Sequence, residues 1–100
     1  MTRAALAIAG NTLSISGVLD FESVLDLDVQ GQQWFESAAP AQCELDLAAV
    51  SYSSSVGIAL VLGWMRAAQR AGRTLALKNI PADMLALARV SGLEPLLTGA

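Results

Sequence analysis

The chain has 100 residues, of which 54% are hydrophobic and 15% are charged. This composition is typical of one compact domain, because disordered chains carry fewer apolar and more charged side chains. The sequence has no histidine and a single cysteine, Cys43, so it lacks imidazole as a general base or metal ligand and cannot form an internal disulfide. We therefore expect neither a metal nor a cofactor.

The charges are unevenly distributed. Residues 1–46 hold seven acidic side chains and one basic side chain, whereas residues 47–100 hold five basic and two acidic ones, for a net charge of −3. Without a basic cluster, a nucleic-acid partner is not expected. The longest apolar run, Val56 to Met65, is about half of the roughly 20 residues that cross a bilayer, and residues 4–9 are too short for a signal peptide core. We expect a cytoplasmic protein without direct membrane insertion.

The first elements are predicted to be a β-hairpin and a helix. Residues 5–9 and 12–16 read as two short strands around a two-residue turn, Gly10-Asn11. Asp20 is a suitable N-cap for the helix that follows. The apolar positions of that helix, which mostly recur at helical spacing, are Phe21, Val24, Leu25, Trp34 and Phe35.

The rest of the chain alternates between strands and helices. We expect a strand over 42–50, a helix over 55–71, a strand over 74–77, a helix over 82–90 and a last turn over 93–97. Gly72 is placed to end the second helix, and Pro81 is placed as the first residue of the third. Trp64, inside the second helix, is more typical of a core than of an interface.

This order of elements predicts an α/β fold. Each strand–helix–strand unit leaves its two strands parallel, so the hairpin and the later strands form a four-stranded mixed sheet with about three helices mainly on one face. The chain has no repeats or linkers, so we expect a single domain over residues 1–100.

The most informative stretch is the junction between the third strand and the second helix, where three serines precede a strongly apolar helix. A helix start carries unpaired backbone N–H groups and a positive dipole end, so hydroxyls there can cap the helix, contact a partner or accept a phosphate. A phosphate at Ser55, the candidate phosphorylation site, is expected to weaken a partner complex without unfolding the domain. The predicted partner-binding residues are Tyr52, Ser53, Ser54, Ser55, Val56 and Ile58.

Two motifs resemble those of STAS domains, the sulfate-transporter and anti-sigma-factor-antagonist family. In that family a strand ends in an apolar–Asp–Ser/Thr–Ser/Gly–Gly–Leu–Gly/Ala turn, which resembles residues 53–59, and an earlier Gly–x–Leu–Asp resembles residues 17–20. Two departures are clear. Ser54 replaces the aspartate, and Val56 occupies the position at which many antagonists carry their phosphorylated serine.

Within the family, the chain is most similar to the small cytoplasmic subunit of bacterial phospholipid-transporting ABC complexes. This resemblance implies a non-catalytic protein that binds the ATPase subunit, while permease and lipid-binding subunits handle the phospholipid and the chain stays peripheral to the inner membrane. It also implies that the hydroxyl of Ser55 faces the partner.

Two other functions remain open from the sequence. The first is an anti-sigma-factor antagonist regulated by serine phosphorylation. The second is an enzyme with Ser55 as nucleophile, for which the chain offers no histidine base and only Lys78 as an amine. The missing base favours a protein that is not an enzyme.

Overall fold

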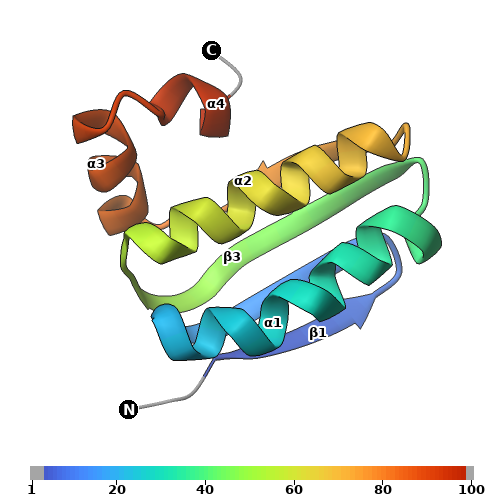
Figure 1. Ribbon diagram of the computed structural model, residues 1–100, viewed down its shortest axis with the longest axis horizontal. Coiled ribbons are helices and arrows are strands. Elements are labelled where there is room, and N and C mark those ends of the chain that lie inside the picture. The colour runs from blue at the N-terminus through green and yellow to red at the C-terminus, as the bar shows by residue number, and fades with distance from the viewer. Residues whose placement is uncertain (1–3, 99–100) are drawn as a thin grey trace.

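The computed structural model describes residues 4–98 as a sheet covered by helices (Figure 1). Its elements are β1 (Ala5–Ala9), β2 (Thr12–Leu19), α1 (Phe21–Gln33), a π-helical turn η1 (Trp34–Ala38), β3 (Gln42–Ser53), α2 (Ser55–Arg70), β4 (Thr74–Lys78), α3 (Ala82–Val90) and α4 (Glu94–Thr98).

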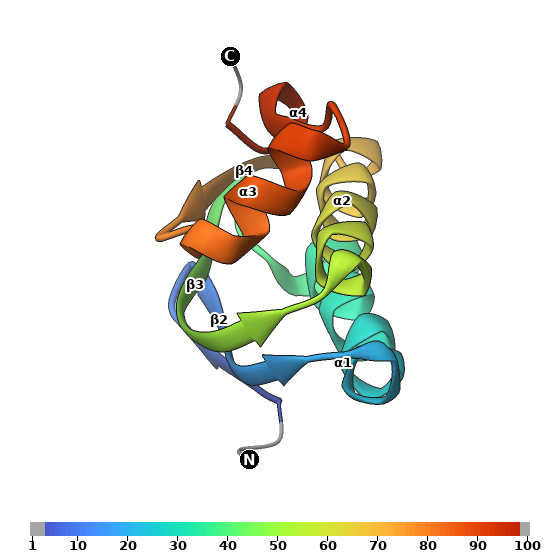
Figure 2. The same cartoon turned by 90° about the vertical axis from the view of Figure 1, so that its left-hand side faces the viewer.

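The four strands form one mixed sheet in the order β1-β2-β3-β4. β1 runs antiparallel to β2, whereas β3 lies parallel to both β2 and β4. Helices α1 and α2 lie side by side against one face of the sheet, and α3 lies beside the beginning of α2 (Figures 1 and 2). The predicted α/β fold with a four-stranded mixed sheet is confirmed.

Strands β2 and β3 are each three residues longer than the sequence predicts. β2 continues to Leu19 instead of ending at residue 16, and β3 continues to Ser53 instead of ending at residue 50. The extra residues pair with each other, Val18 with Tyr52 and Leu19 with Ser53. Because this pairing joins segments far apart in the chain, alternation within either segment could not reveal it.

Smaller differences occur at the helices. Pro81 is the N-cap of α3 and not its first residue, and the last predicted turn forms α4. Gly72 adopts a φ of 76° after the end of α2, as its predicted role as a helix stop requires.

Trp64 is the centre of the packing between α1 and α2. Its side chain is fully buried, its Nε1 donates a hydrogen bond of 3.1 Å to the carbonyl of Asp28, and its ring centroid lies 5.9 Å from that of Phe35. The predicted core position of Trp64 is confirmed. α1 approaches the indole closely because residue 31 is glycine, and a Cβ added to Gly31 would overlap the ring.

We predict that Gly31→Ala destabilises the protein by about 1–3 kcal/mol, because the added methyl group displaces a buried and hydrogen-bonded indole. Gly63→Ala is the matched control, since Gly63 is also helical but has no atom within 4 Å of an added Cβ. That change should stabilise α2 by up to about 1 kcal/mol, as alanine is the better helix former. Urea unfolding followed by tryptophan fluorescence measures both, and equal effects of the two variants would contradict the proposed overlap.

Candidate functional site

The candidate site lies where two parallel strands end and two helices begin. β2 leads into α1 and β3 leads into α2, and the pairing of Leu19 with Ser53 places both exits at the same edge of the sheet. Asp20 caps α1 and Ser54 caps α2. Two positive helix ends and their capping side chains therefore share one end of the molecule.

Asp20 caps α1 through reciprocal hydrogen bonds. Its Oδ1 accepts from the backbone N–H of Ser23 at 3.0 Å, and the Ser23 hydroxyl oxygen accepts from the backbone N–H of Asp20 at 3.0 Å. The Ser23 hydroxyl also donates to the carbonyl of Val18 at 2.8 Å, which ties the helix to the end of β2. Hydrogen bonds from Ser23 lower the pKa of Asp20 below its usual value, because they stabilise the carboxylate.

The three serines of the junction have three different environments. Ser53 is 1% exposed, its hydroxyl donates to the carbonyl of Ser54 at 3.0 Å, and its backbone N–H donates to Oδ2 of Asp83 at 3.1 Å. Ser54 is half-buried, and its hydroxyl donates to the Leu19 carbonyl at 3.2 Å while its oxygen accepts from Val56 N–H at 3.3 Å. Ser55 is exposed, and its hydroxyl makes no hydrogen bond with a described residue. Ser55 is therefore the serine whose hydroxyl is available to a partner.

Two predicted partner-binding residues need correction, because Ser53 and Ile58 are buried and cannot form part of an open surface. Ile58 is 3% exposed and belongs to the face of α2 that packs on the core. The end of β3 turns Ser53 inward, and Gly57 approaches its hydroxyl so closely that an added Cβ would overlap it. Tyr52 is 53% exposed, Val56 is half-buried and Ser54 serves as the cap.

The sequence analysis missed an apolar stripe on α1. Phe21, Leu25 and Val29 are 66%, 61% and 59% exposed, although the sequence placed Phe21 and Leu25 on the helix's apolar pattern without separating them from its core face. The buried residues of α1 are instead Val24, Leu27 and Gly31. A regular spacing of four residues from Phe21 to Val29 was the signal that could have revealed a second apolar stripe.

We group the accessible residues of α1, of the end of β3 and of the start of α2 as one candidate surface. Phe21 begins α1 next to the strand ends, and Leu25 and Val29 continue the stripe along that helix. We call this surface the helix-start face, and it consists of Phe21, Leu25, Val29, Tyr52, Ser55 and Val56. Apolar contact area beside adaptable hydroxyl groups is typical of protein–protein interfaces.

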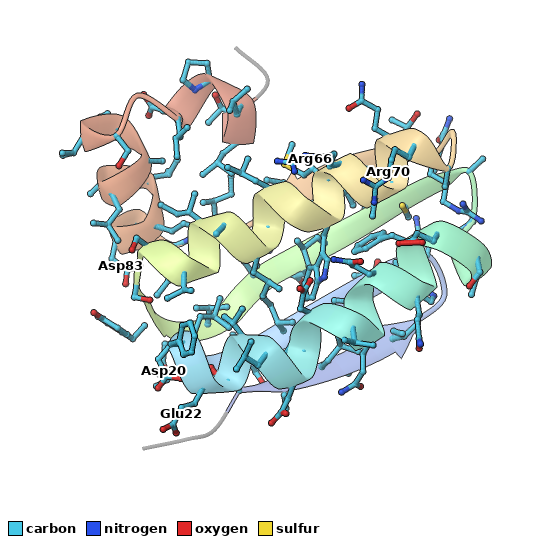
Figure 3. All side chains as sticks on the ribbon, viewed as in Figure 1. Asp20, Glu22, Arg66, Arg70 and Asp83 are labelled. Atoms are coloured by element: carbon cyan, nitrogen blue, oxygen red, sulfur yellow. The ribbon has the colours of Figure 1, made fainter. Side chains whose placement is uncertain are left out.

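The charges near this surface are mostly acidic at one end. Asp20 and Glu22 of α1 and Asp83 of α3 lie toward the helix starts, whereas Arg66 and Arg70 lie further along α2 (Figure 3). Asp83 also accepts hydrogen bonds from the Ser53 and Met84 N–H groups, so its carboxylate fastens α3 to the end of β3. A phosphate on Ser55 would join an end of the molecule that is already negative.

Lys78, the amine that the sequence offers as a partner for a Ser55 nucleophile, lies far from Ser55. Lys78 pairs in register with Asp46, seven residues before the end of β3, which is on the order of 20 Å along the strand from the helix start.

No helix within residues 4–98 is long and apolar enough to span a bilayer.

Comparison with known proteins defines the class. The family model described as the Mlab STAS domain matches residues 4–98, so the chain belongs to the STAS domain family. STAS domains are generally non-catalytic and occur in anti-sigma-factor antagonists and in accessory proteins that bind other proteins. No curated protein matches the chain.

The fold is also found in solved structures. The unphosphorylated anti-sigma-factor antagonist SpoIIAA is 24% identical with a TM-score of 0.71, covering 92% of this chain and 83% of that one. The phosphorylated form of SpoIIAA, a Bacillus cell-fate determinant, is 26% identical with a TM-score of 0.67, covering 92% and 86%. A chain in the complex of the diguanylate cyclase SiaD with its activator SiaC from Pseudomonas aeruginosa is 21% identical with a TM-score of 0.60, covering 98% and 88%.

We predict that Ser54→Ala destabilises the protein by about 0.5–2 kcal/mol, because α2 loses its side-chain cap. Ser55→Ala is the matched control one residue later, and it should change the free energy of unfolding little because its hydroxyl is exposed and has no described partner. Thermal or urea unfolding separates the two, and a larger loss for Ser55→Ala would refute this assignment of the cap.

We also predict a pH effect from Asp20. Because folding lowers the pKa of this carboxyl, its contribution to stability is complete above the ordinary aspartate pKa of about 3.9 and disappears as the pH falls through the lower folded value. Asp20→Asn keeps a capping side chain but removes the titration. The melting temperature of this variant should fall less than that of the wild type between about pH 6 and pH 3, and parallel curves would show that Asp20 contributes no such linkage.

Proposed function

We propose that this protein is a non-catalytic accessory subunit that binds the ATPase of a bacterial phospholipid-transport ABC complex of the Mla type and supports its assembly or activity. The observation that carries the proposal is the helix-start face, which exposes apolar side chains and the free hydroxyl of Ser55 at one edge of the domain. The match to the Mlab STAS family over residues 4–98 supports this choice of partner. In this proposal the protein is cytoplasmic and reaches the inner membrane only through its partner, in a complex that also holds permease and lipid-binding subunits.

The local chemistry favours contact over modification as the role of this surface. An interface gains most from apolar groups that lose water on binding, and Phe21, Leu25 and Tyr52 are each more than half exposed. Ser55 can then exchange its bound water for a hydrogen bond to the partner. The acidic groups at the same end favour a partner surface that is neutral or basic.

The alternative function is an anti-sigma-factor antagonist controlled by serine phosphorylation. Its support is the likeness to SpoIIAA, of which a phosphorylated form is known. Against it, residue 56 is a half-buried valine without a hydroxyl, so a phosphate would have to attach to the neighbouring Ser55. Mass spectrometry after incubation with a cognate serine kinase tests this alternative, which predicts a modified Ser55.

Co-purification with a tagged ATPase subunit from the same organism tests the leading proposal. We predict that Leu25→Glu and Ser55→Glu each weaken the complex by about tenfold or more, because each places a charge where an apolar or neutral contact is desolvated. Both variants should melt near the wild-type temperature, since both positions are exposed.

Val90→Glu is the matched control for the binding experiment. Val90 is an 89% exposed apolar residue at the end of α3, outside the helix-start face. This variant should bind the ATPase as the wild type does. Failure of the wild-type chain to form a stoichiometric complex would refute the ATPase partner, and unchanged binding by Leu25→Glu would place the interface elsewhere.

A further inference from the structure

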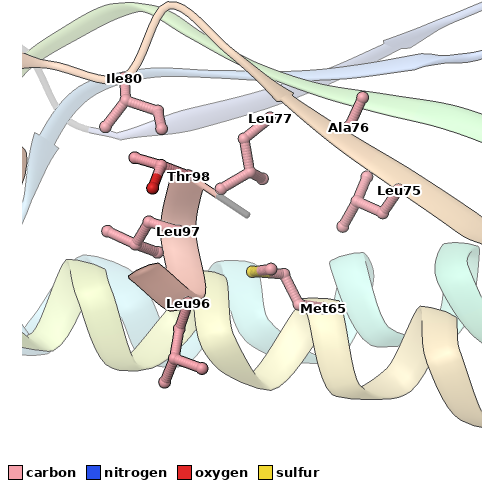
Figure 4. A pocket seen from close by; sticks show the side chains of 8 residues that line it. All are labelled: Met65, Leu75, Ala76, Leu77, Ile80, Leu96, Leu97 and Thr98. Carbon is pink, nitrogen blue, oxygen red and sulfur yellow. The ribbon is translucent and has the colours of Figure 1, made fainter. Parts of the chain in front are cut away.

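An apolar hollow lies between α2, β4 and α4, away from the helix starts (Figure 4). It has a volume of about 450 Å3, within the range of roughly 300–1,000 Å3 that small-molecule sites occupy. The apolar side chains that line it come from all three elements and from the loop that follows β4. They are Met65, Leu75, Leu77, Ile80, Leu96 and Leu97.

The hollow exists because the hydrogen bond and the ion pair that hold the α4 segment connect it to α3. The backbone N–H of Leu93 donates to the Ala88 carbonyl at 2.7 Å, and Arg89 pairs with Glu94 at 2.8 Å, so these ties connect the α4 segment to α3. Toward the sheet, α4 inserts Leu97, which is 4% exposed. The inward side chains of β4, Leu75 and Leu77, are therefore covered only in part.

The lining selects an apolar occupant. Among the described residues that line the hollow, Thr98 carries the polar side chain, and its hydroxyl already donates to the Glu94 carbonyl at 3.0 Å. Apolar atoms make up most of the surface of the hollow, so an apolar occupant gains more from contact with it than water does. A flexible hydrocarbon chain satisfies the lining, and the unbranched side chain of Met65 can adapt to it.

The Arg66 side chain brings a positive charge next to this hollow. A second hollow of about 290 Å3 adjoins the first, shares Met65 and Leu96 with it, and is lined also by Leu62, Arg66 and Gln69. Among the arginines of residues 4–98, Arg66 alone has no hydrogen bond or ion pair. Arg70 pairs with Glu36, Arg73 donates to the Ala39 carbonyl and Arg89 pairs with Glu94.

We propose that these two hollows bind an amphiphile with one hydrocarbon chain and an anionic head group. The chain lies against Met65, Leu77 and Leu97, and the head group meets the Arg66 guanidinium at the outer hollow. An arginine fork binds a carboxylate or a phosphate through paired hydrogen bonds, so either head group fits. This site is separate from the helix-start face and does not depend on the ATPase partner.

Methyl-detected NMR with methionine labelling tests the site directly. Added dodecanoate should shift the Met65 methyl signal in a saturable way and leave Met84 unchanged, because Met84 is fully buried on α3 and lines neither hollow. Dodecyl phosphate should do the same. Dodecanol and dodecyltrimethylammonium should bind about tenfold more weakly or worse, because neither carries a negative charge for the guanidinium.

Three variants test the assignment of residues. Leu77→Phe should fill the inner hollow and abolish the Met65 shift, while Arg66→Glu should weaken dodecanoate binding by about tenfold or more. Arg70→Glu is the matched control one turn along α2, outside both hollows, and should bind within about twofold of the wild type. Thermal melts confirm that each variant is folded, and Arg66→Glu tests the site independently because that side chain is exposed.

The outcomes separate cleanly. A saturable Met65 shift that is lost in Leu77→Phe and weakened in Arg66→Glu supports the proposal. The absence of a saturable shift, equal shifts at Met65 and Met84, or equal weakening by Arg66→Glu and Arg70→Glu would overturn it. Preference for dodecyltrimethylammonium over dodecanoate would overturn the role of Arg66.

Discussion

The parallel pairing of β2 with β3 is the constraint on which the rest of this structure depends. It sets Leu19 beside Ser53, and because each strand leads directly into a helix, it also sets the starts of α1 and α2 beside each other. The Ser54 hydroxyl and backbone N–H both bond to the Leu19 carbonyl, which fastens the two exits together. A shift in this register would separate the exposed residues of the helix-start face from one another.

The junction divides its tasks among neighbouring residues. Ser53 belongs to the core, Ser54 stabilises the start of α2, and Ser55 keeps a free hydroxyl at the surface. Gly57 makes this division possible, because its missing side chain leaves room for the inward Ser53 hydroxyl. A surface built on residues that are themselves fixed by the core is pre-organised for a partner, and pre-organisation lowers the entropy lost on binding.

The two proposed binding regions differ in the side chains that they offer to a ligand. The helix-start face combines apolar side chains with acidic neighbours and suits a protein surface, whereas the hollow under α4 combines a half-open, mostly apolar lining with an arginine that has no ion pair within residues 4–98 and suits a small amphiphile. α2 connects them, since Ser55 and Val56 begin the helix while Met65 and Arg66 lie in its second half. The buried Trp64 packs α2 against α1, so the two regions keep a fixed position relative to each other.

Local pattern was enough to predict the order of the elements, the mixed sheet, the cap at Asp20 and the burial of Trp64, because alternation, helical spacing and capping residues act over a few neighbours. The direction in which each serine points, the burial of Ile58 and the exposure of Phe21 and Leu25 were decided only by the tertiary structure. These depend on which side of a strand or helix meets the core, and contacts between residues distant in the chain decide that. The hollow beside β4 has the same origin, because its walls come from three elements whose separation is a property of the assembled domain.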